Sequence, residues 1–461
     1  MKGPFIVFLL CVLANLSAQP TGKWYALLSA GAQSLPLELD LRADGGTLSS
    51  PRQSPAPIPL SDVTVVGDSL SIAVASIGMT FGGRLSGDTL TGIFRQGLFS
   101  TPLTFYRTPP PEDDSGKSGQ QPRPQDPTEF PYRRDTVSFP GGGEGVRLSG
   151  ELTRPEGSSS AVVVLISGSG PQDRNEELAA PIDHRPFLVL SDHLTRSGYA
   201  VLRYDDRGVG ESTGSFSAAT SADFAEDVAA AVGYLRAREE FAELPLGLIG
   251  HSEGGMIAPM VAMASPEIDF LVLLAAPGLP IDSLMLEQRR QLMGGDSPEQ
   301  PVLRAVYGYA KEHPEQESVA FADGIRRTVG YALPQLDSTF RSAIADTAAF
   351  SANFLGMVQT PWMRYFLAFE PATYLEKVTV PVLAINGEKD RQVTATENLQ
   401  AIGEALDRAG NDDVTLLELP GLNHLFQPAD TGMPAEYGRI TTTLDPALLE
   451  RVTNWLNRRY R

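Results

Sequence analysis

The feature that most constrains the fold of this chain is a serine placed between an apolar strand and an apolar helix. The strand is predicted at 246–249 and the helix at 256–264, where nearly every position is apolar. The stretch Gly250-His251-Ser252-Glu253-Gly254 joins them. Glycines at both ends of this stretch let the strand and the helix approach closely, which predicts a tight, strained turn that exposes the Ser252 hydroxyl.

A second stretch, Gly210-Glu211-Ser212-Thr213-Gly214, shows the same spacing of glycine and serine. Its context differs, because the strand predicted at 199–204 ends before Asp205 and a loop then precedes Ser212. A tight strand-to-helix turn cannot contain such a loop. We therefore predict Ser252, and not Ser212, as a nucleophile.

A nucleophilic serine needs a histidine as general base, and two histidines follow Ser252 in the chain. His313 lies in a charged segment that is typical of an exposed surface. His424 follows a strand predicted at 414–419 and a Pro-Gly turn, and a loop just past a strand is where a catalytic base is expected. His424 is the predicted base, and a loop histidine bonded only to backbone is the alternative.

The acid that orients the imidazole is expected after the preceding strand, which the apolar run 380–385 predicts. Asn386-Gly387-Glu388-Lys389-Asp390 follows that run. Glu388 comes directly after an Asn-Gly pair, a position that is usually used for the turn itself. Asp390 is therefore the predicted acid, with Glu388 as the competing candidate.

Acyl transfer also requires backbone amides that stabilise an oxyanion. The amide of Glu253, directly after the nucleophile, is the first predicted donor. The second is the amide of Ser169, because the buried strand 161–166 ends in the small residues Ser167-Gly168-Ser169-Gly170. A glycine-rich loop after a strand can instead hold phosphate, but this loop lacks the Lys-Ser/Thr ending of a P-loop and is too short for G-x-G-x-x-G.

These motifs resemble those of the α/β-hydrolase superfamily, and within it those of bacterial carboxylesterases with a GSGPQDR oxyanion loop and a GHSEGG nucleophile turn. The resemblance covers roughly residues 130–461. The stretches that match are Gly168–Arg174, Arg203–Ser212, Gly250–Gly255, Asn386–Asp390 and Asn423-His424. The resemblance implies an α/β fold with a mostly parallel, doubly wound sheet and a helical cap. It also implies a catalytic triad of Ser252, His424 and Asp390.

The same resemblance assigns residues 205–212 to a loop near the site, which accounts for the second glycine–serine stretch. Ser167 departs from the histidine that many members carry there, and this bears on how the oxyanion loop is oriented. Asp173 and Arg174 either meet a charged substrate group or pair with neighbours and fix that loop, and we favour the second interpretation. The Glu253 carboxylate is favoured by the helix dipole whether or not it contacts substrate.

Composition divides the rest of the chain. Residues 108–129 are rich in proline and polar residues and are predicted as a linker. Before them, the alternating apolar positions at 35–41 and three later runs, 69–74, 79–81 and 90–94, predict strands separated by glycine turns, so 21–107 is predicted as a small all-β, barrel-like domain. Its opening Gly22-Lys23-Trp24 resembles the entry strand of lipocalins. Sugar or lipid binding, subunit pairing, shielding of the active site and simple packing all remain open for it.

Residues 1–18 are predicted as a secretory signal, with a basic start, an apolar run from Phe5 to Leu16 and a cleavage site after Ala18. The run is too short to cross a bilayer as an ordinary helix, and no later stretch is long enough either. Export to the periplasm or the medium is expected. The single cysteine, Cys11, lies inside the signal, so the mature chain is expected to contain no disulfide.

The charge balance limits the partners. There are 37 Lys and Arg residues against 56 Asp and Glu residues, a formal net charge of −19. An anionic surface argues against nucleic acid and anionic membranes as partners, although it does not identify a substrate. The predicted chemistry requires no metal and no organic cofactor, and the oligomeric state is not predicted.

An inserted helical cap is predicted at about 280–372. About a hundred residues separate the strands predicted at 270–274 and 380–385, far more than one crossover helix needs. Runs such as 284–293 and 362–367 have helical periodicity and are rich in methionine and aromatic residues. Helix packing explains most of this pattern, but part of it should line an acyl pocket, because the insertion lies over the carboxyl ends of the strands.

The predicted function is a secreted serine carboxylesterase that cleaves small or medium acyl esters through an acyl-enzyme on Ser252. A thioesterase is disfavoured because coenzyme A is not expected outside the cytoplasm. A serine exopeptidase on the same fold is an alternative, whereas the prolyl-oligopeptidase architecture needs a propeller that 21–107 is too short to form. An inactive, exported binding protein is the alternative from another class.

Overall fold

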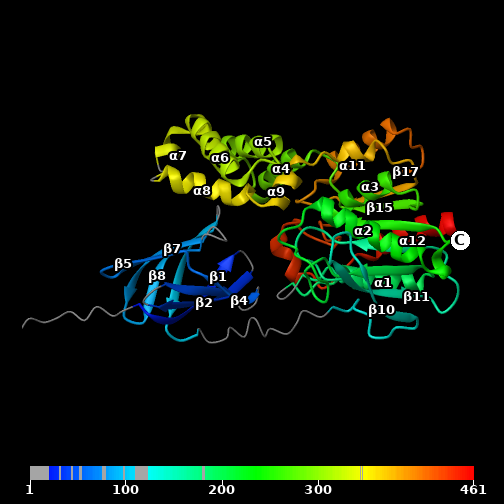
Figure 1. Ribbon diagram of the computed structural model, residues 1–461, viewed down its shortest axis with the longest axis horizontal. Helices are drawn as coiled ribbons and strands as arrows, with labels where there is room; N and C mark the ends of the chain where they lie inside the picture. The colour runs from blue at the N-terminus through cyan, green and yellow to red at the C-terminus, as the bar shows by residue number, and fades with distance from the viewer. Residues whose placement is uncertain are drawn as a thin grey trace, which may run out of the picture. The chain divides into compact units, whose positions relative to one another are not determined.

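The computed structural model describes residues 20–461 apart from 31–32, 43–44, 51–53, 75–78, 97–98, 110–122, 179–181, 343 and 345. The chain divides into two compact units, Met1–Asp113 and Asp114–Arg461, each with its own sheet (Figure 1). The predicted signal, 1–18, and most of the predicted linker, 108–129, lie outside the described residues.

The first unit contains one antiparallel sheet of nine strands in the order β4-β3-β2-β1-β9-β8-β7-β6-β5. Hairpins join neighbours on each side, and β1 pairs with β9 in the middle. The strands are β1 Gly22–Ala30, β2 Gln33–Arg42, β3 Gly45–Ser50, β4 Ser54–Pro59, β5 Asp62–Val66, β6 Ser69–Val74, β7 Met79–Ser86, β8 Thr89–Gln96 and β9 Phe99–Tyr106. The prediction of an all-β domain is confirmed.

This sheet curls around a single core. Leu48 of β3 and Ile72 of β6 belong to the same buried cluster, although five strands separate β3 from β6 in the sheet order. Trp24 is fully buried in that cluster, and the rings of Phe81 and Phe105 meet edge to face with centroids 5.2 Å apart. Within the described residues β4 and β5 do not pair with each other, so the sheet is barrel-like without a closed ladder there.

The second unit contains an eight-stranded sheet in the order β10-β11-β13-β12-β14-β15-β16-β17. Its first pairs, β10 with β11 and β11 with β13, are antiparallel, and all later pairs are parallel. The strands are β10 Arg133–Pro140, β11 Arg147–Arg154, β12 Val162–Ile166, β13 Ala200–Tyr204, β14 Leu246–His251, β15 Phe270–Leu274, β16 Val382–Gly387 and β17 Val414–Leu419. This order is that of an α/β-hydrolase sheet, so the predicted fold class is confirmed.

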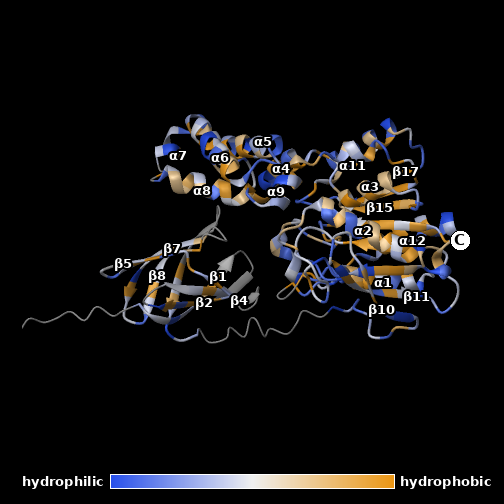
Figure 2. Cartoon of the chain, viewed as in Figure 1, coloured by the Kyte–Doolittle hydropathy of each residue, from blue (hydrophilic) through white to orange (hydrophobic). Residues whose placement is uncertain are grey.

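Helices cover both faces of this sheet, and side chains alternate between the two cores. Val162 and Val164 of β12 pack with the helices of one face, whereas Val163 and Leu165 pack with those of the other. Figure 2 shows the apolar character of the central strands. The first face carries α2 Ser221–Arg236, α3 Glu253–Ala264 and α11 Ala395–Arg408, and the second carries α1 Pro186–Arg196 and α12 Pro446–Tyr460.

Local sequence signals fix where these helices begin. Thr220 and Asp223 form a capping box at the start of α2. At the start of α12 the Asp445 carboxylate accepts the amide of Ala447 at 2.8 Å, and Pro446 occupies the first helical position. The N-termini of α2 and α12 are therefore capped by side chains of the residues that precede or open them.

The insertion between β15 and β16 is helical, as predicted. Its helices are α4 Ile281–Met293, α5 Gln300–Glu312, α6 Ser318–Ala332, α7 Ser338–Ser342, α8 Thr347–Val358, α9 Pro361–Ala368 and α10 Pro371–Leu375. Val306, Phe321 and Phe354 are buried in a core of its own. Short 3-10 helices lie at η2 Glu239–Phe241, η3 Leu333–Gln335 and η4 Pro434–Arg439. Among the described residues, no helix combines the length and the apolar character that a membrane crossing needs.

The separate cores predict that the α/β unit folds without the β domain. In the described residues the core around Trp24 draws only on strands of the first unit. Deletion of residues 1–113 should therefore leave cooperative thermal unfolding of the remainder, with a melting temperature within a few degrees (about 1 kcal/mol) of the corresponding transition in the full chain. Circular dichroism and calorimetry measure this. A truncated chain without a cooperative transition would show that the first unit completes the second.

Candidate active site

The predicted turn at Ser252 is present and strained. Ser252 follows β14 directly and precedes α3, with φ 51° and ψ −117°, in a region that non-glycine residues rarely adopt. A Cβ atom at Gly250 would lie 2.1 Å from the Gly254 carbonyl oxygen, and one at Gly254 would lie 2.1 Å from the Ile166 carbonyl oxygen. Only glycine fits at these two positions, because the strand and the helix approach each other closely, as the sequence pattern predicted.

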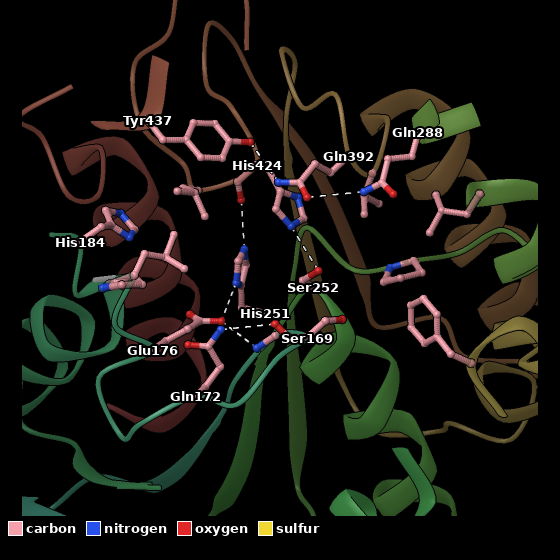
Figure 3. Close-up of a pocket in the computed structure, with 18 of the residues that line it drawn as sticks. Ser169, Gln172, Glu176, His184, His251, Ser252, Gln288, Gln392, His424 and Tyr437 are labelled. Carbon is pink, nitrogen blue, oxygen red and sulfur yellow. Dashed lines mark hydrogen bonds and ion pairs between the residues drawn. The ribbon is translucent and has the colours of Figure 1, made fainter. Parts of the chain in front are cut away.

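The structure brings Ser252, His424 and Asp390 together. His424 Nε2 lies 3.1 Å from Ser252 Oγ, and His424 Nδ1 lies 2.7 Å from Asp390 Oδ2 (the serine–histidine pair is drawn in Figure 3). The Asp390 side chain is buried, and its Oδ1 accepts the amides of Gln392 and Val393 at 2.8 and 2.9 Å. These amides fix the carboxylate, so that its other oxygen faces the imidazole.

The competing acid and base lie elsewhere. Glu388 Oε2 accepts the amide of Gly421 at 2.7 Å, so this carboxylate is used by the adjoining turn. His313 lies at the end of α5 in the cap, where its ring stacks on Tyr309 with centroids 4.2 Å apart. Neither side chain is bonded to Ser252.

Ser212, the serine of the second glycine–serine stretch, is buried and structural. Its hydroxyl donates to the Asp205 carbonyl oxygen at 2.7 Å and accepts the Ser149 amide at 2.9 Å. The Ser212 hydroxyl therefore uses both its donor and its acceptor on backbone groups, and these two bonds fasten the loop after β13 to β11. It has no histidine partner among the described residues.

The two predicted oxyanion donors lie beside the nucleophile with free amides. A Cβ atom at Gly168 would lie 3.2 Å from Ser252 Cβ, which shows how closely the loop after β12 approaches. The Gly168 amide is already used, because it donates to Glu176 Oε1 at 2.7 Å. Within the described part of the chain neither the Ser169 amide nor the Glu253 amide has an acceptor. These two groups can therefore receive a developing negative charge.

The side chain of Glu253 is bonded to α2 and to the cap. Its carboxylate accepts the Ser221 hydroxyl at 2.6 Å and the Trp362 indole N–H at 2.9 Å. Burial raises the pKa of Glu253 above its ordinary value. Because Trp362 belongs to the cap helix α9, this carboxylate ties the cap to the start of α3.

Asp173 and Arg174 fix the oxyanion loop. The Arg174 side chain and amide both donate to Asp205, with contacts of 2.6 to 2.9 Å, and the Asp173 carboxylate accepts the amides of Asn175 and Glu177. The interpretation that these residues pair with neighbours accounts for all of these contacts.

Ser167 and Asp206 settle the orientation of the same loop. The Ser167 hydroxyl donates to Asp206 Oδ1 at 3.1 Å, and the Gln172 amide donates to Oδ2 at 3.0 Å. Burial raises the pKa of Asp206 to about 8, and the charges of Glu253 and Glu176 act in the same direction. The hydroxyl of Ser167 therefore anchors this loop to Asp206.

Glu176 and His251 are site residues that the sequence interpretation missed. Glu176 Oε1 accepts both the Gly168 amide and His251 Nδ1, the latter at 2.8 Å. His251 Nε2 lies 3.0 Å from the backbone carbonyl oxygen of His424. A continuous chain of hydrogen bonds therefore joins the oxyanion loop to the loop of the catalytic base, as Figure 3 shows.

The surroundings of His251 favour its charged form. A carbonyl oxygen only accepts, so Nε2 donates, and Nδ1 donates as well when the Glu176 carboxylate is ionised. Burial lowers the pKa of a histidine, but the charge and hydrogen bond of Glu176 and the carbonyl of His424 outweigh it and raise the pKa of His251 above 6.5. Asp390 acts in the same direction from the other side of the site.

A cavity of about 300 Å³ opens above Ser252. Residues from the sheet loops and from the cap helices α4 and α9 line it, so the cap forms its roof. His184 is a fully buried part of its lining, and burial lowers the pKa of this histidine to about 4, so it is neutral at ordinary pH. In the residues that the structure describes, no group of three or more His, Cys, Asp or Glu side chains is arranged to hold a metal ion.

The strand order of the sheet and the strained turn between β14 and α3 give the Asp114–Arg461 unit the α/β-hydrolase fold. Residues 186–304 match the family described as serine aminopeptidase, S33. The chain is also similar to Esterase EstD of Thermotoga maritima, with 25% identity over 311 residues. That match covers 67% of this chain and 65% of EstD, so it spans less than two thirds of the relative.

Two solved structures show the extent of structural likeness. An esterase of Pyrococcus furiosus has a TM-score of 0.43 and 18% identity, covering 72% of this chain and 92% of that one. A hypothetical protein from Pseudomonas aeruginosa has a TM-score of 0.46 and 16% identity, covering 72% and 96%.

Replacement of Glu176 by glutamine tests the charged pair. The pKa of His251 is raised in the folded state, so the pair stabilises the fold fully below pH 6.5, and this contribution is lost as the pH rises through the folded-state pKa. Glu176→Gln should lower the free energy of unfolding by about 3 kcal/mol at pH 6, and by less at pH 9. Denaturant titrations from pH 5.5 to 9 measure the difference.

The matched control is Glu211→Gln, which removes a carboxylate that is 73% exposed. Glu211→Gln should lower the free energy of unfolding by less than about 1 kcal/mol, and this loss should be the same at pH 6 and pH 9. A loss in Glu176→Gln that is constant over the whole range would contradict a charged His251.

Proposed function

We propose that this protein is a serine hydrolase, and most specifically a carboxylesterase, that cleaves small or medium acyl esters through an acyl-enzyme on Ser252. The observation that carries the proposal is the bonded series Ser252, His424 and Asp390 beside two free backbone amides. The similarity to Esterase EstD supports an ester substrate. The proposal includes export, which is based on the apolar run within 1–18.

The geometry supports a two-step reaction. His424 Nε2 accepts the proton of Ser252 as Oγ attacks the ester carbonyl, and the amides of Ser169 and Glu253 bind the oxyanion. The Asp390 carboxylate, which two backbone amides hold in place, stabilises the imidazolium. The imidazolium then protonates the leaving alcohol, and water, activated by the same histidine, releases the acid and restores Ser252.

A second candidate activity is amino-terminal peptide cleavage. The match of residues 186–304 to the serine aminopeptidase family favours it. The same nucleophile and oxyanion donors serve both reactions, so the leaving group distinguishes them. Hydrolysis of aminoacyl p-nitroanilides at rates comparable to those of p-nitrophenyl esters would favour the peptidase.

Substitution of the triad tests the proposal. Ser252→Ala should lower kcat for p-nitrophenyl butyrate by a factor on the order of 10⁵ to 10⁶, and Asp390→Asn by about 10⁴, because the imidazole then takes the wrong tautomer. The release of p-nitrophenolate measures both. Thermal unfolding should show that both variants remain folded.

Ser212→Ala is the matched control, because it removes the other serine of a glycine–serine stretch. This variant loses two buried hydrogen bonds and should be less stable by about 1–3 kcal/mol, but its folded fraction should retain activity. Full activity in Ser252→Ala would rule out the proposed nucleophile.

A further inference from the structure

The cavity above Ser252 has two chemically different walls. One wall is apolar and includes Pro277 and, from the cap, Leu284, Met285, Trp362 and Phe366. The other wall is formed by Gln288, Gln392 and Tyr437, which we call the amide–phenol wall. A plain alkyl ester would pack against the apolar wall but would form no hydrogen bond with the amide–phenol wall.

Hydrogen bonds hold the amide–phenol wall in place. Gln392 Nε2 donates to the Tyr437 hydroxyl at 3.0 Å, and Gln288 Nε2 donates to Gln392 Oε1 at 3.4 Å. The three side chains come from α4, from the loop after Asp390 and from η4. Figure 3 shows them joined by dashed lines on the side of the cavity that holds His424.

The wall is anchored to the catalytic machinery. The amide of Gln392 donates to Asp390 Oδ1, so the backbone that orients the catalytic acid also positions this glutamine. Tyr437 is only 4% exposed, so its ring has no freedom to leave the cavity. The polar groups of the wall are therefore preorganised relative to Ser252, as a specific substrate contact requires.

The wall has hydrogen-bonding capacity to spare. Each glutamine amide carries two donor hydrogens and the phenol carries one. The two internal bonds use only one donor each, and this holds whichever way the amides are turned. Among the described residues, no other partner is bonded to the side chains of Gln288 and Tyr437.

The ligand that fits these groups is polar but uncharged. No Lys or Arg is among the described residues that line the cavity, and His251 is already paired with Glu176, so none of these residues offers an unpaired cation to an anion. The carboxylate of Glu176 is already paired with His251, and His184 is neutral. Hydroxyl groups, which both donate and accept, match free amide and phenol groups without adding charge.

We infer that the preferred substrates are esters that carry free hydroxyl groups, such as acyl esters of a polyol or sugar or esters of a hydroxy acid. This inference rests on the proposed esterase function and gives it a substrate class. The apolar wall takes the hydrocarbon part of the ester, and the amide–phenol wall binds the hydroxyl groups. The cavity volume of about 300 Å³ lies at the lower end of the range for small-molecule sites.

Two matched pairs of esters test the inference in the full chain. Glycerol 1-monobutyrate against propyl butyrate places the hydroxyl groups on the alcohol. p-Nitrophenyl 3-hydroxybutyrate against p-nitrophenyl butyrate places one on the acyl group. In one pair at least, kcat/KM should be about tenfold or more higher for the hydroxylated ester, because only this ester can form hydrogen bonds with the amide–phenol wall.

Tyr437→Phe should bring that ratio close to one, because it removes the hydroxyl and keeps the ring. Gln288→Met, a variant in the cap, should also bring the ratio close to one. It replaces the first variant in the test if Tyr437→Phe does not fold. Tyr307→Phe, a buried tyrosine in the cap core that does not line the cavity, should keep the wild-type ratio.

The outcomes separate the two claims. Hydrolysis of all four esters with a ratio near one in both pairs, or a ratio that Tyr437→Phe and Gln288→Met leave unchanged, would overturn the inference and leave the esterase proposal standing. No hydrolysis of any ester by the wild-type chain would overturn both. A preference in the glycerol pair alone identifies the alcohol as the hydroxylated part, and one in the acyl pair alone identifies the acid.

Discussion

The close approach of two backbone segments at Ser252 is the constraint on which the rest of this site depends. Strand β14 and helix α3 meet without a loop, and a side chain at Gly250 or Gly254 would collide with backbone oxygens 2.1 Å away. Ser252 is thereby forced to a φ of 51°. The turn also leaves the first amide of α3 without an acceptor, so the packing that strains the nucleophile also creates one of the oxyanion donors.

Hydrogen bonds convert this local geometry into a site that includes distant loops. The pair of Glu176 and His251 connects the oxyanion loop to the backbone of His424. Each of the two buried side chains requires its partner in one position, because removal of either would leave an uncompensated buried charge. Glu176 and His251 are 75 residues apart in the sequence, so only the folded sheet brings them together.

The sequence predicts the sheet, the cap and the triad because each rests on a local signal. Ser252, Asp390 and His424 each follow a strand, and parallel strands place their carboxyl ends at one edge of a sheet. Glu176 gives no such signal, since it lies at φ 53° in an irregular loop among other acidic residues. The contacts of Tyr437 and Gln288 with Gln392 also escape prediction, because they join a 3-10 helix, a cap helix and a sheet loop whose spacing no periodic pattern specifies.

The central claim is that Ser252 is the one serine activated for acyl transfer. Labelling of the full chain with an alkyl fluorophosphonate, followed by digestion and mass spectrometry of the peptides, tests it most directly. The account predicts a single adduct on the peptide that contains Ser252, lost when His424 is replaced by alanine, and none on the peptide that contains Ser212. An adduct on another serine, or ester hydrolysis that continues undiminished in the fully labelled protein, would contradict it.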